Sequence, residues 1–235
     1  MKKLSFYSHL IDSIKLGKKS LAILLDPDKI NLFNGLEVLN NLPEIDYVFV
    51  GGSHVEDGKT DLVVKALKTK TKRPIVLFPG DVNQITPHAD AILYLSLMSG
   101  VNPEYLNGQQ IKAVPKLKNS ALEILPTAYI LIDGGQQSSV ERVSQTKPIP
   151  QTEIERIVDT CIASEYSGKK LIYLEAGSGA KHPVNVSIIS EVKRNTNIPL
   201  IVGGGIRTEI QRENIYTAGA DLIVMGTAFE EKAGV

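Results

Sequence analysis

The sequence of 235 residues contains no tryptophan, one cysteine and no excess of either charge, with 26 Lys and Arg against 26 Asp and Glu. Without a net positive field, the chain is not expected to bind nucleic acid, and any contact with a membrane is expected to be peripheral. The lone Cys161 cannot form an internal disulfide. Its neighbours in IVDTCIAS favour a buried small side chain over a reactive thiol.

Long hydrophobic runs are also missing. No segment approaches 18 consecutive apolar residues, so no transmembrane helix is expected. The first 20 residues are basic, but their apolar residues follow helical spacing and lack the continuous apolar core of a signal peptide. We therefore expect a cytoplasmic protein with a single domain over residues 1–235.

Short apolar runs recur along the chain and predict buried strands. They are rich in β-branched and aromatic residues and do not alternate with polar ones, which is typical of parallel strands buried on both faces. The runs are LAILL (21–25), YVFV (47–50), IVLF (75–78), AILYL (91–95), TAYILI (127–132), LIYL (171–174), PLIV (199–202) and DLIVM (221–225).

Amphipathic stretches separate most of these runs and predict helices, at residues 31–42, 57–70, 150–164, 183–196 and 208–220. Eight strands with intervening helices in a chain of this length indicate an α/β fold of the (β/α)8 barrel (TIM barrel) type. A doubly wound dinucleotide-binding domain is less favoured, because DPDK follows the first strand where GxGxxG is expected.

One interval departs from the regular barrel pattern. Residues 79–90 (PGDVNQITPHAD) contain two prolines and are too few for a crossover helix. The sequence therefore predicts a modified barrel whose third helix is replaced by an extended strap, which leaves room for an apolar groove along the barrel wall. Residues 134–150 form a long polar loop and are a candidate lid.

The distinctive residues of the chain collect at the carboxyl ends of the predicted strands, where barrel enzymes keep their active sites. Gly203-Gly204-Gly205 and Gly226-Thr227 follow the last two strands. Glycines let the backbone approach an anion closely, and barrels commonly bind phosphate after strands seven and eight. These glycines thus predict a phosphate cup, with Thr227 opening a final short helix; the alternative is that they only make tight turns.

Two acidic positions suggest further chemistry, each with a plain structural alternative. Asp26, together with Ser53 from the neighbouring loop, is a candidate Mg²⁺ site, because Mg²⁺ takes one or two carboxylates and completes its shell with substrate phosphates. Alternatively, Asp28 caps the following helix and Asp26 is a loop residue. Glu175 ends a strand and precedes a glycine-rich loop, so it either acts on a ligand or lies in a tight turn.

Other catalytic patterns are not found. The four histidines have no partner at metal-ligand spacing, and no Ser-His-Asp or Cys-His pattern appears. No Lys lies within a strand end, which disfavours Schiff-base chemistry.

The motifs LLDPDK, GGSHVEDG, FPGDVNQI, LPTAYILIDGG, YLEAGSGA, VGGGIR and MGTAFE together resemble the geranylgeranylglyceryl phosphate synthases, over nearly the whole chain from about residue 20. The resemblance implies a modified (β/α)8 barrel without its third helix. It also implies transfer of a polyprenyl group from its diphosphate to the 3-hydroxyl of sn-glycerol 1-phosphate, with Mg²⁺ as cofactor, forming the first ether bond of ether-linked lipids. Members of this family form dimers and hexamers, so a homo-oligomer is expected.

The resemblance also implies roles for individual residues. Asp26 and Ser53 would bind the Mg²⁺, and Glu175 would contact the glycerol hydroxyls as the candidate base, with Tyr173 also placed at the catalytic centre. The residues implied to hold glycerol 1-phosphate are Tyr173, Leu174, Glu175, Ala176, Gly177, Ser178, Gly179, Gly203, Gly204, Gly226 and Thr227.

The sequence departs from the pattern of related enzymes at one position, and two other functions are alternatives to prenyl transfer. Related bacterial heptaprenyl enzymes carry Lys two residues before the metal aspartate, where this chain has Leu24, so the cation that assists the diphosphate is open, with Lys29 a candidate. The first rival is another phosphate-binding barrel, such as the isomerases and synthases of histidine, tryptophan or thiamine biosynthesis. The second is a non-catalytic barrel that retains the phosphate cup.

Overall fold

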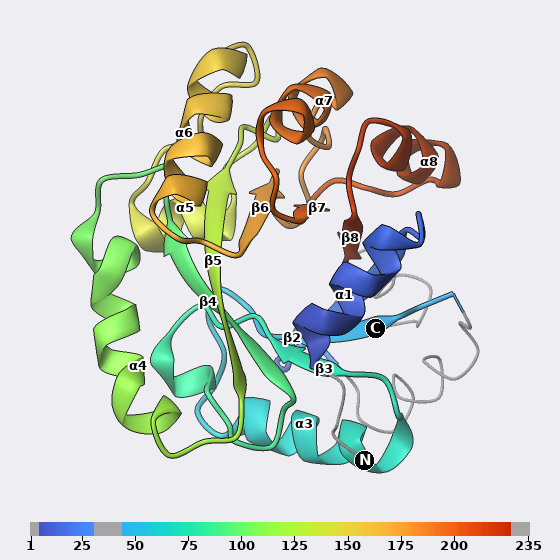
Figure 1. The fold of residues 1–235 in the computed structure, drawn as a ribbon. Coiled ribbons are helices and arrows are strands. Elements are labelled where there is room, and N and C mark those ends of the chain that lie inside the picture. Colours follow the sequence, from blue (N-terminus) through green and yellow to red (C-terminus); the bar gives the residue numbers. More distant parts are fainter. Residues whose placement is uncertain (1–4, 31–43, 227–235) are drawn as a thin grey trace.

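The computed structural model describes residues 5–30 and 44–226, and its centre is a closed barrel of eight parallel strands. Each strand pairs with the next in sequence, and β8 pairs with β1 (Figure 1). The strands are β1 (Ser20–Leu25), β2 (Tyr47–Val50), β3 (Ile75–Leu77), β4 (Ala91–Leu97), β5 (Glu123–Leu131), β6 (Leu171–Glu175), β7 (Leu200–Gly203) and β8 (Leu222–Met225).

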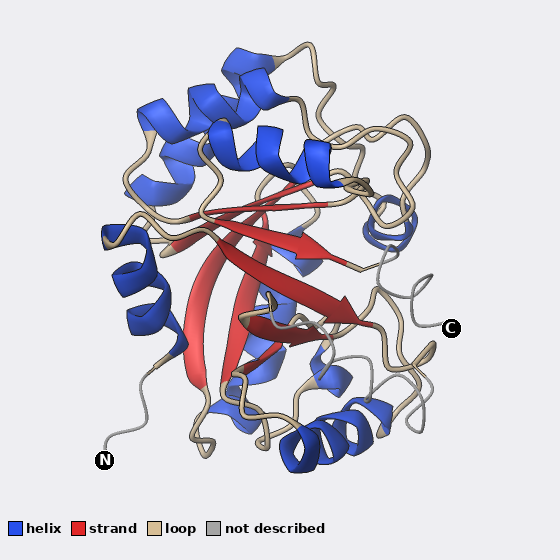
Figure 2. Cartoon of the chain, turned by 90° about the vertical axis from the view of Figure 1, so that its right-hand side faces the viewer, coloured by secondary structure: helices blue, strands red, loops and turns tan. Residues whose placement is uncertain are grey.

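Helices surround this barrel, as Figure 2 shows from a second direction. The α-helices are α1 (Phe6–Lys15), α3 (Lys59–Lys70), α4 (Gln109–Leu117), α5 (Ser139–Ser144), α6 (Ile154–Tyr166), α7 (Val186–Asn195) and α8 (Glu209–Thr217). A short 3-10 helix, η1 (Val82–Gln84), and a π-helical turn, η2 (Glu104–Gly108), complete the elements.

The predicted fold is confirmed, since all eight apolar runs form strands of one closed parallel barrel. Four of the five predicted helices correspond to α3, α6, α7 and α8. The predicted helix at residues 31–42 lies outside the described residues, as does Thr227. Two further helices were not predicted: α4, which contains Pro115, and α5 within the long loop after β5.

The predicted strap is present between β3 and β4, where the only helical element is the single turn η1. The strap is fixed on both sides. The Val82 N–H donates to Oε1 of Gln109, and Lys116 Nζ donates to the Val82 carbonyl, which ties the strap to α4. The Thr86 hydroxyl donates to Asp61 of α3 at 2.5 Å. The strap is thus a defined part of the wall.

The core has two layers, because alternate residues of each strand face opposite sides. Along β6, Tyr173 packs in the barrel interior with residues of the other strands, whereas Ile172 and Leu174 pack outward against the helices. Large buried interior residues include Tyr47, Phe49, Leu93, Leu125 and Tyr173. This alternation directs Glu175, two residues after Tyr173, to the interior side at the end of the strand.

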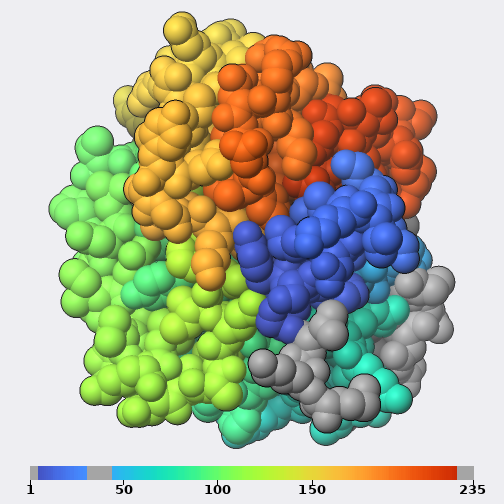
Figure 3. All heavy atoms as spheres, viewed as in Figure 1, coloured from blue at the N-terminus to red at the C-terminus, as the bar shows by residue number. Residues whose placement is uncertain are grey.

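Helix α1 covers the amino-terminal end of the barrel. Its first turn is capped by Ser5, whose hydroxyl accepts from the Ser8 N–H, and its residues Phe6 and Leu10 are buried in the interior cluster. Figure 3 shows α1, in blue, filling the middle of this face. His9 is exposed on α1, and its Nδ1 lies 2.6 Å from the Tyr47 hydroxyl. This end of the barrel is closed, so ligands must enter at the other end.

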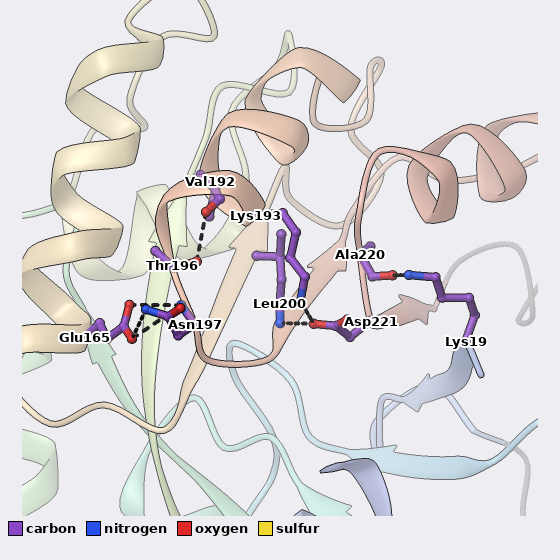
Figure 4. Close-up of polar contacts among 9 residues, drawn as sticks. All are labelled: Lys19, Glu165, Val192, Lys193, Thr196, Asn197, Leu200, Ala220 and Asp221. Carbon is purple, nitrogen blue, oxygen red and sulfur yellow. Dashed lines mark hydrogen bonds and ion pairs between the residues drawn. The ribbon is translucent and has the colours of Figure 1, made fainter. Parts of the chain in front are cut away.

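Near the same end, an ion pair joins Asp221, which directly precedes β8, to Lys193 of α7 (Figure 4). Asp221 is 3% exposed; it accepts from Lys193 Nζ at 2.6 Å and from the Leu200 N–H at 2.8 Å. Lys19 donates to the Ala220 carbonyl at 2.8 Å, and partial burial lowers the pKa of its ammonium group. These contacts are far along the strands from their carboxyl ends, so their role is structural.

Two expectations from the composition can be compared with the structure. Cys161 is fully buried on α6, as predicted, and this burial raises the pKa of its thiol. Within the described ranges, no helix has the length and apolar character that crossing a membrane requires.

Candidate active site

A cavity of about 470 Å³ opens at the carboxyl ends of the strands. Its wall includes eight of the residues predicted for the site, which come from β1, β2, β6, β7 and β8 and the loops that follow them. These residues are Asp26, Ser53, Tyr173, Glu175, Ser178, Gly179, Gly204 and Gly226. The barrel therefore gathers in one cavity the residues that the sequence places up to 200 positions apart.

The remaining predicted residues that the structure describes do not line the cavity. Leu174 and Ala176 are buried and pack in the outer layer, so their side chains face away from the cavity. Gly177 and Gly203 contact the site residues from behind: the Gly177 N–H donates to Oε1 of Glu175 at 2.7 Å. That N–H is thus engaged by the carboxylate and does not point to a phosphate. Thr227 is outside the described residues.

Glu175 is the buried acid of the cavity and is 6% exposed. Burial raises the pKa of its carboxyl to about 7, although the Gly177 N–H acts to lower it. The nearby Tyr173 hydroxyl acts in the same direction as the Gly177 N–H, but it makes no hydrogen bond of normal geometry to the carboxylate. A carboxyl with a pKa near neutrality can exchange protons at physiological pH, which suits a general base.

The glycines of β7 leave room for this carboxyl. A Cβ at Gly203 would lie 2.4 Å from the Tyr173 hydroxyl and 3.0 Å from Oε2 of Glu175. A Cβ at Gly204 would lie 2.5 Å from Oε1 of Glu175 and 2.6 Å from the Gly177 nitrogen, and Gly204 has φ +85°. Any other residue at these positions would displace the carboxyl, so glycine is required for packing as well as for conformation.

Three aromatic rings form the floor beside Glu175. Phe78 stacks on Tyr173, with ring centroids 5.0 Å apart and an interplanar angle of 17°. Tyr129 contacts both, at centroid distances of 5.8 Å to Phe78 and 5.5 Å to Tyr173. Burial and the neighbouring Glu175 raise the pKa of both tyrosines well above the usual value, so both stay neutral. The Tyr173 hydroxyl is buried and has no hydrogen-bond partner in the described part of the chain.

The predicted phosphate cup consists of two loops that are held together by side chains. Arg207 extends from the turn after β7 to the Gly179 carbonyl at 3.4 Å, and the Gln136 amide donates to the same carbonyl. Gly179 and Gly205 have positive φ, of 73° and 70°. The turn after β6 and the turn after β7 therefore form a single glycine-lined wall with the Arg207 guanidinium beside it.

Asp26 occupies the opposite side of the cavity. Its Oδ1 accepts from the Asp28 N–H at 3.1 Å, and its Oδ2 lies 3.5 Å from Lys29 Nζ. A Cβ at Gly52 would meet three atoms of the Asp26 carboxyl group at 3.1 to 3.2 Å, so the Gly52–Ser53 turn packs directly against this carboxylate. The described residues contain no cluster of three His, Cys, Asp or Glu with the arrangement of a metal site.

Asp28 has a different role, because it holds two loops together. Both of its carboxylate oxygens accept from the Glu56 N–H at 3.2 Å, and Lys59 Nζ lies 3.2 Å from Oδ1. Burial acts to raise the pKa of Asp28, but the Glu56 N–H and Lys59 outweigh it and the pKa is lowered. The helix that Asp28 was predicted to cap lies outside the described residues. Both carboxylates line the cavity, but Asp28 joins its loop to the Glu56–Lys59 segment, whereas Asp26 contacts its own turn and the Gly52–Ser53 turn.

The cavity continues between the strap and α4, where the sequence predicts an apolar groove. Val82, Ile85, Tyr94 and Ala113 line this part. The Tyr94 hydroxyl donates to the Gln110 carbonyl at 2.7 Å, which leaves the ring facing the groove. Because no full helix covers the wall between β3 and β4, apolar side chains are accessible from the cavity.

The candidate lid loop lies along the rim of the same cavity. Ser138 caps α5 by accepting from the Glu141 N–H at 3.0 Å, and a Cβ at Gly177 would come within 2.7 Å of the Ser138 Cβ. Val140 and Val143 of α5 line the cavity. The loop thus packs on the turn after β6.

Three residues that shape the site were not predicted from the sequence, and a fourth was considered only in another role. Phe78 has the pattern of an ordinary strand residue, Tyr129 is in the sequence only one of several tyrosines that could limit the prenyl chain length, and Arg207 is only the end of a glycine motif. Gln84, which lies in the polar strap, carried no sign that it is 1% exposed. Tyr129 is the one with a usable signal, because a strand tyrosine near a predicted carboxyl end is expected to face the site.

The comparisons with known proteins agree with this geometry. The profile of the PcrB family matches residues 15–234, which is nearly the whole chain. The chain belongs to the PcrB family. A curated relative from Zunongwangia profunda, named geranylgeranylglyceryl phosphate synthase, is 56% identical over 94% of this chain and 95% of its own length. A protein of the same name from Flavobacterium johnsoniae is 49% identical over 96% of this chain and 94% of its own length.

Members of known structure have the same architecture. The crystal structure of (S)-3-O-geranylgeranylglyceryl phosphate synthase from Thermoplasma acidophilum, in complex with its substrate sn-glycerol-1-phosphate, superimposes with a TM-score of 0.91. It is 32% identical and covers 97% of this chain and 92% of its own. The predicted resemblance to this family is therefore confirmed for the PcrB chain described here.

Proposed function

We propose that this chain transfers a polyprenyl group from its diphosphate to the 3-hydroxyl of sn-glycerol 1-phosphate, forming an ether bond and releasing diphosphate. Family membership supports the proposal, as does the substrate bound to the T. acidophilum relative. The observation that carries it is the position of Glu175, a buried carboxyl with a pKa of about 7 between a glycine-lined wall and an aromatic floor. Geranylgeranyl is the proposed donor group, from the names of the relatives.

The glycine-lined wall is proposed to bind the phosphate of glycerol 1-phosphate. Backbone N–H groups of Gly204, Gly205 and Gly226 can approach a phosphate without steric hindrance, and Arg207 supplies positive charge at the rim. Anchoring the phosphate there directs the glycerol part toward Glu175. The proximity of the glycerol hydroxyl to the reacting carbon then reduces the entropic cost of the reaction.

Glu175 is proposed to remove the proton of the attacking hydroxyl. Its carboxylate form accepts a hydrogen bond from Gly177, which leaves Oε2 on the side of Tyr173 and Gly203. We propose that the Tyr173 hydroxyl, which is buried and has no partner among the described residues, hydrogen-bonds a glycerol oxygen. A buried polar group without a partner is costly, so a ligand that satisfies it gains affinity.

Asp26 and Ser53 are proposed to hold Mg²⁺ on the opposite side of the cavity. The donors fit this ion, because a carboxylate and a hydroxyl suit a hard cation whose remaining ligands are phosphate oxygens and water. A Mg²⁺ bound there would neutralise negative charge on the leaving diphosphate. Lys29, beside Asp26 at 3.5 Å, is a candidate for further charge neutralisation.

The apolar groove between the strap and α4 is proposed to hold the prenyl chain. Its lining by Val82, Ile85 and Tyr94 matches a hydrocarbon chain, whereas the glycine-lined wall matches a phosphate. A homo-oligomer remains the expectation from the family.

Another phosphate-binding barrel reaction is the alternative. The tryptophan synthase α-subunit of Pyrococcus furiosus shares the fold with a TM-score of 0.56, but at 14% identity this likeness concerns the fold alone. An acid–base isomerase would use no long apolar groove, and the groove beside the strap therefore favours the prenyltransferase.

The proposal is tested by product analysis. Purified protein is incubated with sn-glycerol 1-phosphate and a series of prenyl diphosphates of increasing chain length, with Mg²⁺ or with excess EDTA. We expect a prenyl ether that requires Mg²⁺ and is formed fastest with one chain length. Absence of ether with every donor would contradict the proposed function.

A further inference from the structure

Gln84 joins the strap to the loop after β2 by two hydrogen bonds to one residue. Its Nε2 donates to the Gly52 carbonyl at 2.8 Å, and its Oε1 accepts from the Gly52 N–H at 3.1 Å. The Gln84 side chain is 1% exposed, whereas Gly52 is partly exposed and lines the cavity, so these bonds are partly shielded from water. Loss of both would leave the partly buried N–H and carbonyl of Gly52 without these partners.

The loop after β2 packs so closely against the loop after β3 that no side chain fits between them. A Cβ at Gly51 would lie 1.9 Å from the Phe78 carbonyl oxygen, and a Cβ at Gly80 would lie 2.4 Å from the Gly52 carbonyl oxygen. The loops after β2 and β3 therefore meet backbone to backbone. In this arrangement the amide of Gln84 fixes the orientation of the Gly52 peptide groups.

Gly52 in turn contacts the residues on the diphosphate side of the cavity. Its Cα packs against the Asp26 carboxylate, and Ser53 is the next residue along the chain. A rotation of the Gly52 peptide groups would move the Ser53 hydroxyl relative to Asp26. The geometry of this pair thus depends on a side chain that touches neither of them.

The strap has other anchors that do not reach this loop. Thr86, which is 2% exposed, donates to Asp61 of α3, on the outer side of the barrel. Val82 is tied to α4 through Gln109. Gly80 of the strap also packs on this loop, but through its backbone. Of these hydrogen bonds between the strap and other described residues, the pair from Gln84 is the one that ends on the loop carrying Ser53.

We propose that Gln84 is a positioning residue for the diphosphate side of the site, through the Gly52–Ser53 turn. The strap that replaces the third helix thereby sets the geometry of Asp26 and Ser53. The inference rests on the proposed function for the identity of the ligand. It adds a residue, and a role for the strap, to that function.

The test uses Gln84→Met, which keeps the length of the side chain and removes both hydrogen bonds, and Thr86→Val as the matched control on the same strap. Isothermal titration measures binding of inorganic diphosphate in the presence of Mg²⁺, and separately of sn-glycerol 1-phosphate. Steady-state kinetics give KM for each substrate. Gln84→Glu is a second variant, which keeps the acceptor for the Gly52 N–H but places an oxygen against the Gly52 carbonyl.

For Gln84→Met we expect Kd of diphosphate and KM of the prenyl diphosphate to rise about tenfold or more. The reason is that the N–H and the carbonyl of Gly52 lose their partners, so the Gly52–Ser53 turn is no longer held in place. Kd of glycerol 1-phosphate should stay within about twofold. Gln84→Glu should also weaken diphosphate binding and leave glycerol 1-phosphate binding nearly unchanged. Thr86→Val should change the Kd of neither ligand. Three results would overturn the inference. The Gln84 variants could bind diphosphate as the wild type does, they could bind both ligands equally more weakly, or Thr86→Val could lose diphosphate affinity to the same extent.

The two proposals fail in different ways. If the wild-type protein binds diphosphate with Mg²⁺ but forms no ether, the proposed function is wrong and the Gln84 comparison still gives its answer by titration. If the wild-type protein does not bind diphosphate under these conditions, the role of Gln84 is wrong.

Discussion

Gly204 and Glu175 lie so close that a methyl group on Gly204 would come within 2.5 Å of Oε1 of Glu175. Gly204 also adopts φ +85°, which L side chains rarely adopt. The turn after β7 and the carboxyl at the end of β6 therefore fix each other. This contact joins the proposed phosphate wall to the proposed base.

Gly204→Ala should remove activity by displacing the Glu175 carboxyl. We expect kcat/KM to fall by about 100-fold or more, since misplacement by about 1 Å has effects of this size. The positive φ should cost about 1–3 kcal/mol of stability. Gly168→Ala is the matched control, because Gly168 has φ +83° with no atom within 4 Å of the added Cβ. Equal loss of activity in both variants would show that backbone strain, and not the contact with Glu175, is responsible.

Glu175→Gln should abolish the proton transfer and preserve the shape of the site. We expect kcat to fall by about 10²–10⁴-fold, while Kd of glycerol 1-phosphate, measured by titration, changes little. Because the pKa of the Glu175 carboxyl is about 7, kcat/KM of the wild type should rise with pH and level off above that value. Turnover of the Gln variant near the wild-type rate would remove Glu175 as the base.

The same carboxyl should make stability depend on pH. The pKa of Glu175 is raised on folding from 4.5 to about 7, so the contribution of this carboxyl to stability is fully present below pH 4.5 and is lost as the pH rises through 7. At pH 8 the loss should be on the order of 3 kcal/mol. Glu175→Gln resembles the protonated form and should exceed the wild type in stability at pH 8, with the difference shrinking toward pH 5. Denaturant unfolding at the two pH values measures this; a constant difference would contradict the raised pKa.

Asp26 and Asp28 should respond differently to the same substitution. Asp26→Asn removes the charge that faces the cavity, and we expect kcat/KM for the prenyl diphosphate to fall by about 100-fold or more. Asp28→Asn retains an oxygen that can accept from the Glu56 N–H, and it should keep activity within a few fold. Assays over a range of Mg²⁺ concentrations compare the two. The reverse order of effects would exchange the roles given to these residues.

Much of the fold could be predicted because parallel strands buried on both faces leave apolar runs in the sequence, as LIYL before Glu175 does. The residues at the carboxyl end of each run are then expected to lie in the active site, which is how Glu175 and Asp26 were found. Helix α4 could not be found this way, because Gly108 directly precedes it and Pro115 lies within it. The role of Gln84 depends on a contact with Gly52, 32 residues earlier, and a local pattern contains no information on it.

The aromatic floor was missed for a related reason. Tyr129 and Tyr173 come from β5 and β6, and Phe78 directly follows β3; the three meet only because the barrel closes with Tyr129 in register with Tyr173. Register between strands follows from the packing of the whole barrel and not from any one segment.

The most direct test of the account is the stereochemistry of the acceptor. The protein is given geranylgeranyl diphosphate and Mg²⁺ with either sn-glycerol 1-phosphate or its mirror image, sn-glycerol 3-phosphate, and the ether product is quantified by mass spectrometry. A wall that fixes the phosphate and a single base at Glu175 predict product from the 1-phosphate and little from the 3-phosphate. Equal product from both, or product from neither, would contradict the proposed site.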